Sequence, residues 1–523
     1  MKKLLIVPSL VTILAMMATT VLAQEPDPGT GTSFGAVQNV DKSGNASFRQ
    51  DFYDMDGNLD AYREKQDVVY GGTMGLTTND TPDAPLSVQL PAGWVGSSVV
   101  SSDREAAAVV LIQWFNGSIG ADGITTADYV GVTAPGNDIF CPSVGKRPYE
   151  ATQIVVMNTT AAAVSDVSIS FKDRNGADAG TAMTNINISA NSQKTFSLFD
   201  AAFALPANFL GAARVESAGG TPLAVVAVTH WGYATGAFGS FAYNCLSTDA
   251  GATTLYGPKV QRRAPSWNDG NWLDESGVVV VNTEGTAASA RVEFYDREGN
   301  FGGVFTDTVP AYSARGYNTR WIGNADQTVI EGLIGLGTAA QPEWQGGVVV
   351  RSVGAGAEKL VGVIKQAYAT SEWAGGYTML SDADAGTVWY FPLTYRRGFS
   401  RPWTDYSGIV CQNISAVSVA PEVTFVNRAD DATASFVDAT PFGQYISHGY
   451  NTRYGGNQPA AWFGDMSSGA IGNNLANNFL GAAFVEVAAG QIVCIQETWA
   501  EEVYSDGAFL TGGDANLNNA YGQ

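Results

Sequence analysis

Charged residues, histidines and cysteines are all scarce in this chain, and each shortage excludes a class of protein. Charged residues make up 15% of the 523 residues and hydrophobic residues 45%, whereas a soluble domain averages about 25% charged residues. Together with 60 glycines, this balance argues against disorder and against a helical or coiled-coil protein. Only 2 histidines and 4 cysteines are present, so most metal sites and most histidine-dependent catalysis lack their residues, and we expect no cofactor.

Basic residues are also in short supply. Lys and Arg number 28 against 50 Asp and Glu, a formal charge of −22, so nucleic acid and anionic membranes are poor partners. Beyond the N-terminal segment, no apolar run approaches the roughly 18 residues of a membrane span. The sequence therefore predicts neither nucleic-acid binding nor membrane insertion of the mature chain.

The N-terminus has the pattern of a signal peptide. Lys2 and Lys3 precede an apolar run over residues 4–17, and Val21-Leu22-Ala23 supplies the small residues that signal peptidase requires. We expect residues 1–23 to be cleaved off; an uncleaved membrane anchor is the alternative, although the run is short for a bilayer span. The mature protein is then secreted or held at the extracellular cell surface.

Four copies of one pattern recur in order along the chain. In each copy a bulky residue, usually aromatic, is followed after one residue by Gly, two small residues and a short apolar run, and the glycines are Gly96, Gly211, Gly346 and Gly481. Upstream of each, an apolar segment ends in Asn39, Asn158, Asn282 or Asn413. After 12 or 13 further residues come Phe52, Phe171, Phe294 and Phe425. Ordered landmarks at a period of about 115 to 135 residues indicate tandem repeats.

Each copy has the chemistry of β-strands. Residues 278–281 are all Val, and residues 167–171 alternate apolar with polar side chains. The period is too long for propeller blades, which repeat at roughly 40 to 50 residues. The sequence predicts an all-β fold, a tandem array of four immunoglobulin-like β-sandwich modules. We expect them over residues 24–126, 127–247, 248–381 and 382–506, with a polar C-terminal tail over residues 507–523.

An Asp-x-x-Gly sequence follows the landmark Phe in three copies, starting at Asp54, Asp173 and Asp296. The fourth copy departs, with Asn427-Arg428-Ala429-Asp430. Such sequences join antiparallel strands, so we expect hairpin turns. Calcium loops are the alternative, but an EF-hand loop needs an acidic residue two places earlier, where a Phe stands.

A proline opens the later copies, at Pro142, Pro258 and Pro392, and a basic pair follows it. We expect a first strand at the sheet margin, where Pro is tolerated, with the basic pair flanking it; a protease site or an anion site is the alternative. The first copy lacks this strand, because only residues 24–33, rich in Pro and Gly, precede it. Its open edge is either capped locally or available to another chain, and the tail from residue 509 is a candidate donor for head-to-tail assembly.

Two of the cysteines replace core valines of the last copy. Cys411 aligns with Val37, Val156 and Val280, and Cys494 aligns with Val109, Val226 and Val363. In an exported protein this joint replacement predicts a disulfide that pins the two sheets together. Cys141 and Cys245, near the two ends of the second module, are the remaining pair.

Leu90-Pro91-Ala92-Gly93-Trp94 and Leu205-Pro206-Ala207-Asn208-Phe209 extend the glycine landmark. With the Pro-led strand, the Asn strand and the Asp-x-x-Gly turn, they resemble tandem β-sandwich repeats of secreted and cell-surface proteins of filamentous environmental bacteria. The resemblance covers nearly all of the mature chain, although Gln341-Pro342-Glu343-Trp344 departs from it in the third copy. It implies a surface-exposed scaffold and transfers no catalytic residue.

Two functions fit these features. The first is a non-catalytic secreted or cell-surface structural or adhesive protein, a quasi-linear row of modules for a sheath, surface layer or filament, with itself or cell-surface polysaccharide as partner. The alternative is an extracellular carbohydrate-binding protein whose loop aromatics stack on sugars, unless these rings cap the sandwich ends. Its candidate ligand-binding residues are Trp267, Asp269, Trp272, Asp274, Trp403, Asp405 and Tyr406.

Catalytic motifs are not found. The sequence has no His-Glu-x-x-His and no phosphate-binding Gly-rich loop with Lys. His230 has the counterparts Gln113, Ala367 and Thr498, so we expect a variable strand residue, and His448 has no visible partner. We expect no catalytic residue and no metal site, with a carboxylate-only glycosidase left open.

Overall fold

The computed structural model describes residues 29–78, 84–116, 125–148, 150–233, 236–263, 274–297, 299–319, 343–368, 373–397, 403–452, 475, 478–503, 509–519 and 521–522. Over these ranges the chain is all-β, as predicted. The helical elements within them are two short 3-10 helices, η2 (Ala201–Phe203) and η3 (Thr248–Ala250). Nowhere in the described part of the chain is a helix long and apolar enough to cross a membrane.

The first repeat forms two antiparallel sheets. Its strands are β1 (Gly29–Asn39), β2 (Ala46–Tyr53), β3 (Leu59–Val68), β4 (Thr73–Thr77), β5 (Ser97–Ser102), β6 (Ala106–Asn116) and β7 (Thr125–Val130). The order is β4-β1-β6-β7 in one sheet and β3-β2-β5 in the other.

The other three repeats each form a nine-stranded sheet. The second has β8 (Asp138–Arg147), β9 (Glu150–Asn158), β10 (Val164–Asp173), β11 (Met183–Ile188), β12 (Gln193–Ser197), β13 (Phe209–Ser217), β14 (Leu223–Tyr233), β15 (Gly236–Asn244) and β16 (Leu246–Ser247). The third has β17 (Thr254–Arg263), β18 (Asp274–Asn282), β19 (Ala288–Asp296), β20 (Phe301–Val309), β21 (Ala314–Asn318), β22 (Glu343–Ser352), β23 (Leu360–Tyr368), β24 (Trp373–Thr378) and β25 (Leu380–Ser381). The fourth has β26 (Val388–Arg397), β27 (Trp403–Asn413), β28 (Glu422–Asn427), β29 (Thr433–Val437), β30 (Ser447–Asn451), β31 (Asn478–Glu486), β32 (Ile492–Val503), β33 (Phe509–Asn519) and β34 (Tyr521–Gly522).

These three sheets share one strand order. In the second repeat it is β11-β10-β13-β8-β9-β14-β15, with β12 on β9 and β16 on β8, and the third and fourth repeats follow the same scheme. β8 and β9 pair only where one turns into the other, at Lys146–Ala151 and Arg147–Glu150. The sheet therefore folds into two layers around a buried apolar cluster, which is consistent with β-sandwich modules.

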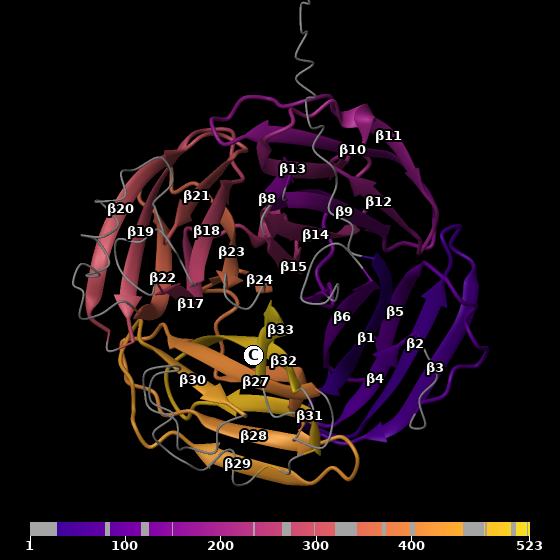
Figure 1. The fold of residues 1–523 in the computed structure, drawn as a ribbon, viewed down its shortest axis with the longest axis vertical. Coiled ribbons are helices and arrows are strands. Elements are labelled where there is room, and N and C mark those ends of the chain that lie inside the picture. The colour runs from indigo at the N-terminus through magenta and orange to yellow at the C-terminus, as the bar shows by residue number, and fades with distance from the viewer. Residues whose placement is uncertain are drawn as a thin grey trace, which may run out of the picture.

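The four repeats close into a ring (Figure 1). The expectation of modules in a row is wrong, because β26 of the fourth repeat packs against β1 and β6 of the first. Ala36 on β1 shares a buried apolar cluster with Leu393 and Tyr395 on β26. The Tyr390 hydroxyl donates to the main-chain oxygen of Val40 at 3.2 Å. At the centre, β7, β15, β24 and β33 contact one another in a cycle.

The first strands lie inside their sheets, which corrects the prediction of a margin strand. β8 lies between β13 on one side and β16 and β9 on the other. Pro142 falls at a register shift of the β8–β13 ladder, where a missing N–H breaks no regular pair. Next to it, the Tyr243 hydroxyl accepts from the Ser143 N–H at 3.1 Å and donates to the Ser143 oxygen at 2.7 Å. A tyrosine from a distant strand thus supplies the hydrogen bonds that the main chain lacks at the bulge beside the proline.

The landmark asparagines hold the loops at one end of each repeat. All four are fully buried. Asn39 Nδ2 donates to the oxygens of Gly44 and Val68, both at 2.9 Å, and Asn39 Oδ1 accepts from the Asp41 N–H. Asn158, Asn282 and Asn413 make the matching bonds in their own repeats. The conserved pattern within the chain is therefore structural.

The landmark glycine and aromatic residue form one packing unit with the landmark Phe. In the second repeat, the rings of Phe171 and Phe209 meet edge to face at 5.9 Å, and the same pair recurs in the other three repeats. A Cβ on Gly211 would lie 2.0 Å from the Lys172 oxygen and 2.8 Å from the Phe209 ring. Glycine is required because the neighbouring strand and the ring leave no room for a side chain.

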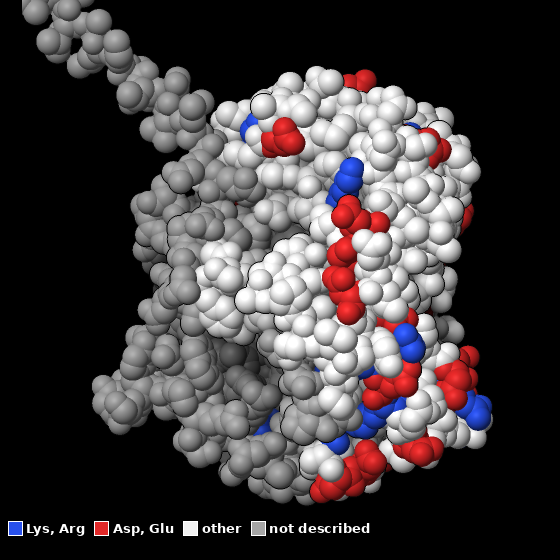
Figure 2. Space-filling view, turned by 90° about the vertical axis from the view of Figure 1, so that its right-hand side faces the viewer, with Lys and Arg blue, Asp and Glu red and all other residues white. Residues whose placement is uncertain are grey.

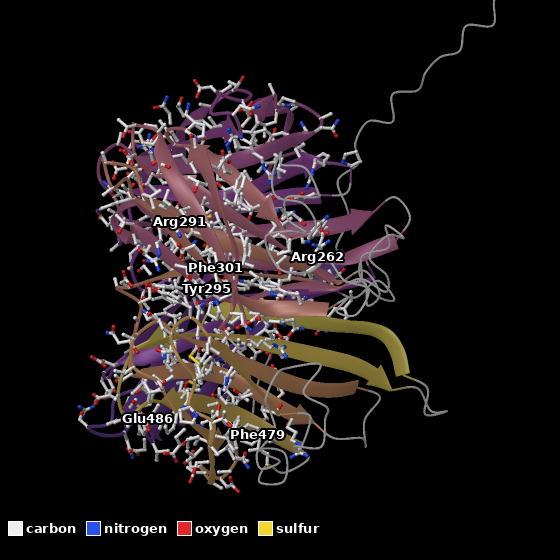
Figure 3. All side chains as sticks on the ribbon, turned by 90° about the vertical axis from the view of Figure 1, so that its left-hand side faces the viewer. Arg262, Arg291, Tyr295, Phe301, Phe479 and Glu486 are labelled. Carbon is white, nitrogen blue, oxygen red and sulfur yellow. A yellow bond between two sulfur atoms is a disulfide. The ribbon has the colours of Figure 1, made fainter. Side chains whose placement is uncertain are left out.

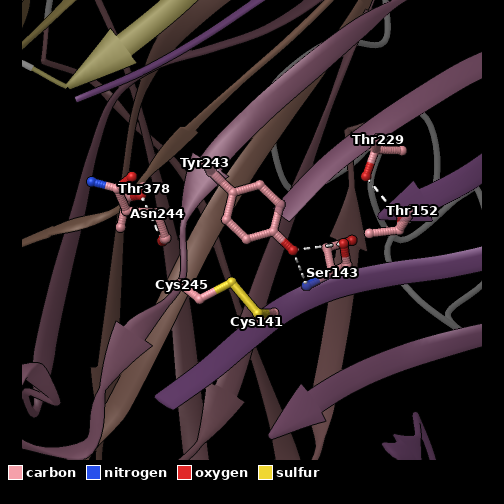
Figure 4. Close-up of a disulfide and its surroundings, with 8 residues drawn as sticks. All are labelled: Cys141, Ser143, Thr152, Thr229, Tyr243, Asn244, Cys245 and Thr378. Carbon is pink, nitrogen blue, oxygen red and sulfur yellow. Dashed lines mark hydrogen bonds between the residues drawn. A yellow bond between two sulfur atoms is a disulfide. The ribbon is translucent and has the colours of Figure 1, made fainter. Parts of the chain in front are cut away.

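Two disulfides are present, Cys141–Cys245 and Cys411–Cys494. The first joins β8 to the residue where the chain crosses from β15 to β16, beside the Tyr243–Ser143 bonds (Figure 4). The prediction that Cys411–Cys494 joins two sheets is wrong, because the two residues are direct partners on neighbouring strands β27 and β32, with Cα atoms 4.1 Å apart. Ile495, and not Cys494, is the counterpart of Val363, so the alignment in the last repeat was displaced by one residue.

The C-terminal segment is not a tail. Phe509–Asn519 forms β33 beside β32, and Tyr521–Gly522 forms β34 beside β26. They complete the fourth sheet as β15 and β16 complete the second. The glycine- and asparagine-rich composition hid these strands, because pairing with an existing edge, and not apolar alternation, orders them.

Candidate functional site

The four candidate ligand-binding residues that the structure describes fall at the start of two matched strands. Outside the described residues lie Trp267, Asp269 and Trp272. The others are placed by their main chain, at the start of β18 for one and of β27 for three: Asp274, Trp403, Asp405 and Tyr406. Since β18 and β27 hold the same place in their sheets, the fold brings both segments to the same end of neighbouring repeats.

Asp274 and Asp405 occupy the position that Glu150 holds in the second repeat, each eight residues before the landmark Asn. Glu150 forms ion pairs with Arg147 at the end of β8 and with Lys365 on β23 of the third repeat, the latter at 2.7 Å. Asp274 lies opposite Arg263 in the β17–β18 ladder. In the second repeat this position therefore supplies a counter-charge to the basic pair.

The environment of Glu150 keeps it charged. Burial alone would raise the pKa of Glu150, but the charges of Lys365 and Arg147 outweigh it and lower the pKa to about 2. Lys259 and Glu497 form a second buried ion pair, between the third and fourth repeats. Both pairs join repeats that are neighbours in the ring, and a buried charge of this kind is tolerated only with its partner.

The basic pairs are tied to their own sandwiches. Arg147 pairs with Glu150, the Lys146 ammonium donates to the Leu205 oxygen at 3.1 Å, and Arg396 donates to the Leu475 oxygen at 2.7 Å. Arg262 on β17 is buried as well (Figure 3). These contacts favour a structural role over a protease site or an anion site.

His448 has a partner that the sequence did not reveal. Its Nδ1 lies 2.7 Å from Asp438 Oδ2, which also accepts from the Tyr450 hydroxyl at 2.9 Å, and its ring stacks on Phe442 at 4.0 Å. Burial would raise the pKa of Asp438, but the hydrogen bonds from His448, the Thr440 N–H and Tyr450 leave it below the usual value. The three polar side chains are buried and hold the β29–β30 region of the fourth repeat together.

His230 is buried at the contact between the first and second repeats. Its Nδ1 lies 2.7 Å from the Ser240 hydroxyl, and its ring meets Trp114 of the first repeat edge to face at 5.0 Å. This placement gives His230 a packing role between the two repeats.

The Asp-rich turns are hairpin turns, as predicted. They join β2 to β3, β10 to β11 and β19 to β20. Asp54 Oδ1 accepts from the N–H groups of Asp56 and Asn58, and Gly57 has φ +87°. The carboxylate is engaged with the main chain of its own turn. Within the described residues no group of three His, Cys, Asp or Glu side chains is arranged to hold a metal.

The outer surface of the first and second repeats is largely uncharged, and acidic side chains gather in a band across it (Figure 2). Basic side chains lie beside acidic ones lower on the same face. Among the described residues of this face, the acidic ones therefore outnumber the basic ones, and they leave no continuous basic surface for an anionic partner.

Comparisons with known proteins find no family and only weak structural similarity. No family model matches the chain, and no curated protein matches it. Among solved structures it is similar to Thermotoga maritima 1070, at 9% identity and TM-score 0.18 over 27% of this chain and 97% of that one. It is also similar to a structure of infectious bursal disease virus Gx strain, at 10% identity and TM-score 0.11 over 91% of this chain and 80% of that one. Such TM-scores support no inference about fold or function.

Sequence reasoning missed the buried charges between repeats. Lys365 directly follows the apolar run of residues 360–364, and that charged residue within a strand is the signal that could have found it. The partners of the buried charges were not predictable, because each pair joins strands of different repeats.

Proposed function

We propose that the protein is a non-catalytic, exported structural or adhesive protein, built from four immunoglobulin-like β-sandwich modules that form a closed ring. Ring closure is the observation that carries this proposal. β8 packs on β18 and β23, β17 packs on β27 and β32, and β26 in the same way packs on β1 and β6. A closed ring in which the first and fourth repeats contact each other is a rigid support for binding loops.

The hairpin turns supply a second set of matched contacts. A Cβ built on Gly57 would lie 2.1 Å from the Ala190 oxygen of the second repeat, and one built on Gly176 would lie 2.7 Å from Pro310 of the third. Gly299 approaches the fourth repeat in the same way. Where the fourth repeat meets the first, the glycine belongs to the repeat that receives the contact: a Cβ on Gly71 of the first repeat would collide with Val426 of the fourth. Each turn is thus seated on the next repeat around the ring.

Two long connections join matched strands of this support. Residues 319–342 join β21 to β22, and residues 452–477 join β30 to β31. β21 and β30 are counterparts in their sheets, and so are β22 and β31. Their sequences carry large apolar residues, among them Trp321, Trp462 and Phe463. Long connections on a rigid scaffold are typical places for binding.

Adhesion can be tested with the purified protein that lacks residues 1–23. We expect it to bind intact source cells, and a variant with residues 455–472 replaced by a Gly-Ser linker to bind several-fold less while melting at the same temperature. The matched control is Asp178→Asn, an exposed change in the β10–β11 turn, which should leave binding unchanged. A protein found only in the cytosolic fraction, or loop replacement without effect on binding, contradicts the proposal.

Carbohydrate binding remains the second candidate. The matched placement of the tryptophan- and aspartate-rich segments at the starts of β18 and β27 favours it. A polysaccharide pull-down with Trp403→Ala tests it: we expect retention to fall several-fold if the ring stacks on sugar. Asp405→Asn is the informative companion, since it should affect stability more than retention if this carboxylate acts as Glu150 does.

A further inference from the structure

Among the described strands, β5 has a neighbour on one side only, unlike its counterparts. It pairs with β2, and no described strand pairs with its other side. β13, β22 and β31 each lie between two strands, and the strand on the side that is open in β5 is β8, β17 or β26. The missing first strand therefore leaves a row of main-chain donors and acceptors along residues 97–102.

Val100 on β5 shows what the missing strand would cover. It is partly exposed, whereas its counterparts Val215, Val350 and Val485 are all 0% exposed. The difference follows from the neighbouring strand, since the four valines hold the same place relative to the landmark glycine and Phe. The first sandwich is left incomplete at this edge.

Val155 on β9 of the second repeat is likewise less buried than its counterparts. It is partly exposed, whereas its counterparts Ala36, Val279 and Val410 are buried. Those three are covered by β26, β8 and β17 of the preceding repeat. Ser97 at the start of β5 donates to the Asn191 oxygen at 2.6 Å, so the open edge adjoins the second repeat. A strand placed here would cover valines on both walls.

None of the described segments of the chain occupies this place. A first strand has ten residues in each of the other repeats, and in the second it ends just before β9 begins. Ahead of β1 the expected mature chain has only Gln24-Glu25-Pro26-Asp27-Pro28, with two prolines and two carboxylates, a composition that disfavours a paired strand. The C-terminal segment is already paired, in β33 and β34.

We propose that the open edge of β5 accepts an extended strand from another polypeptide. The three first strands define its chemistry: aliphatic and aromatic residues around a central proline, followed by a basic pair, as in β26 with Trp389, Phe391 and Leu393 buried. Main-chain pairing with β5 supplies affinity, and apolar side chains that cover Val100 and Val155 supply specificity. A basic end suits a host of net charge −22. The edge accepts this strand whatever the loops of the ring bind.

The test uses a peptide of residues 138–147, the sequence of β8. We expect it to bind the purified protein lacking residues 1–23 in a 1:1 ratio in calorimetry. A control peptide with Ile139→Ser and Phe140→Ser should bind about tenfold more weakly or worse, because it loses two large apolar side chains. Equal binding of the two peptides, or binding of neither, overturns the proposal.

Register gives a sharper test. Ala213 lies opposite Cys141 in β13–β8, and Ser98 is the counterpart of Ala213, since both lie opposite the landmark Phe. A Ser98→Cys variant should therefore form a disulfide with Cys141 of the peptide. Ser102→Cys, also exposed and four residues along β5, is the matched control and should form about one tenth as much adduct or less. Equal cross-linking at both positions contradicts the predicted strand register and overturns the proposal.

Two other occupants have distinct outcomes. If residues 24–28 cap the edge, the peptide binds only after their deletion. If a second copy occupies it, light scattering finds a dimer that the peptide dissociates. Either result overturns assignment of the edge to a different polypeptide.

Discussion

At the scale of single residues, the landmarks have packing reasons that can be tested one by one. We expect Gly211→Ala to destabilise the protein by more than about 2 kcal/mol, because its Cβ would collide with the Lys172 oxygen and the Phe209 ring. Gly277→Ala is the matched control, since a Cβ there meets no atom within 4 Å, and it should change stability by less than about 0.5 kcal/mol. Urea unfolding measures both. Similar losses in the two variants would mean that propensity, and not space, selects glycine.

Asp438 should give the protein a pH dependence on the acid side. Its pKa lies below the usual value in the folded state, so the stability that it contributes is present above about pH 4 and is lost as the pH falls through the folded pKa. We expect Asp438→Asn to cost about 1 to 3 kcal/mol at pH 7, and this difference from the wild type to shrink by pH 3. Denaturant titrations at several pH values check it. Asp178→Asn, at an 89% exposed side chain, should show no such trend.

At the scale of elements, the local part of the fold was predictable and the seating of the strands was not. The strands that end in Asn39 and Asn158, and the turns after Phe52 and Phe171, follow from neighbouring residues, and they are present. The first strand was assigned to the margin because a proline normally breaks a ladder. The residues near Pro142 in sequence do not predict the contact with Tyr243. This residue lies at the far end of the repeat, and its hydroxyl forms hydrogen bonds with the main chain at the bulge. The ion pair of Glu150 was hidden for the same reason, since one of its partners is a lysine two hundred residues away.

The charge pair between the second and third repeats should behave as a unit. Lys365→Met leaves Glu150 buried with Arg147 as its remaining partner, so we expect a loss of about 3 to 5 kcal/mol. Adding Glu150→Gln should recover most of that loss, since Arg147 is 22% exposed and can turn toward water. A double-mutant cycle in denaturant measures the coupling. Additive effects would show that the two side chains stabilise the interface independently.

One disulfide joins β8 to the connection between β15 and β16, and the other joins the neighbouring strands β27 and β32. We expect both in the purified protein. Mass spectrometry of a non-reduced digest is expected to link Cys411 with Cys494 and Cys141 with Cys245. Replacing Cys411 and Cys494 by Ala should cost up to about 4 kcal/mol, the chain-entropy value for this separation. Free thiols, or exchanged partners, would contradict the structure.

At the scale of the whole molecule, the apolar clusters run across repeat boundaries. One buried cluster spans the second and third repeats, another the third and fourth, and Ala36 of the first belongs with β26 of the fourth. We therefore expect one cooperative unfolding transition in calorimetry, with equal calorimetric and van't Hoff enthalpies. Independent modules in a row would give several transitions, and that result would contradict the ring.

The sequence does contain a trace of this arrangement. The four valines of residues 278–281 are all buried, which means that both faces of β18 are covered, one by its own sandwich and one by β8 of the preceding repeat. An uninterrupted apolar strand thus predicts that both faces of its sheet are covered. It does not say which repeat supplies the cover, because four similar copies offer similar surfaces, and so the ring itself was beyond prediction.

If the protein is exported, as we propose, ring closure also sets the order in which its parts can fold. Ala36 and Val109 of the first repeat are buried by β26, which leaves the translocation channel only after most of the chain has passed. Until then, the earliest part of the protein presents an unprotected apolar face and waits for a contact very distant in sequence. Such late pairing slows folding and exposes the nascent chain to aggregation. The export of this protein should therefore depend on holding factors outside the membrane more strongly than its modest module size suggests.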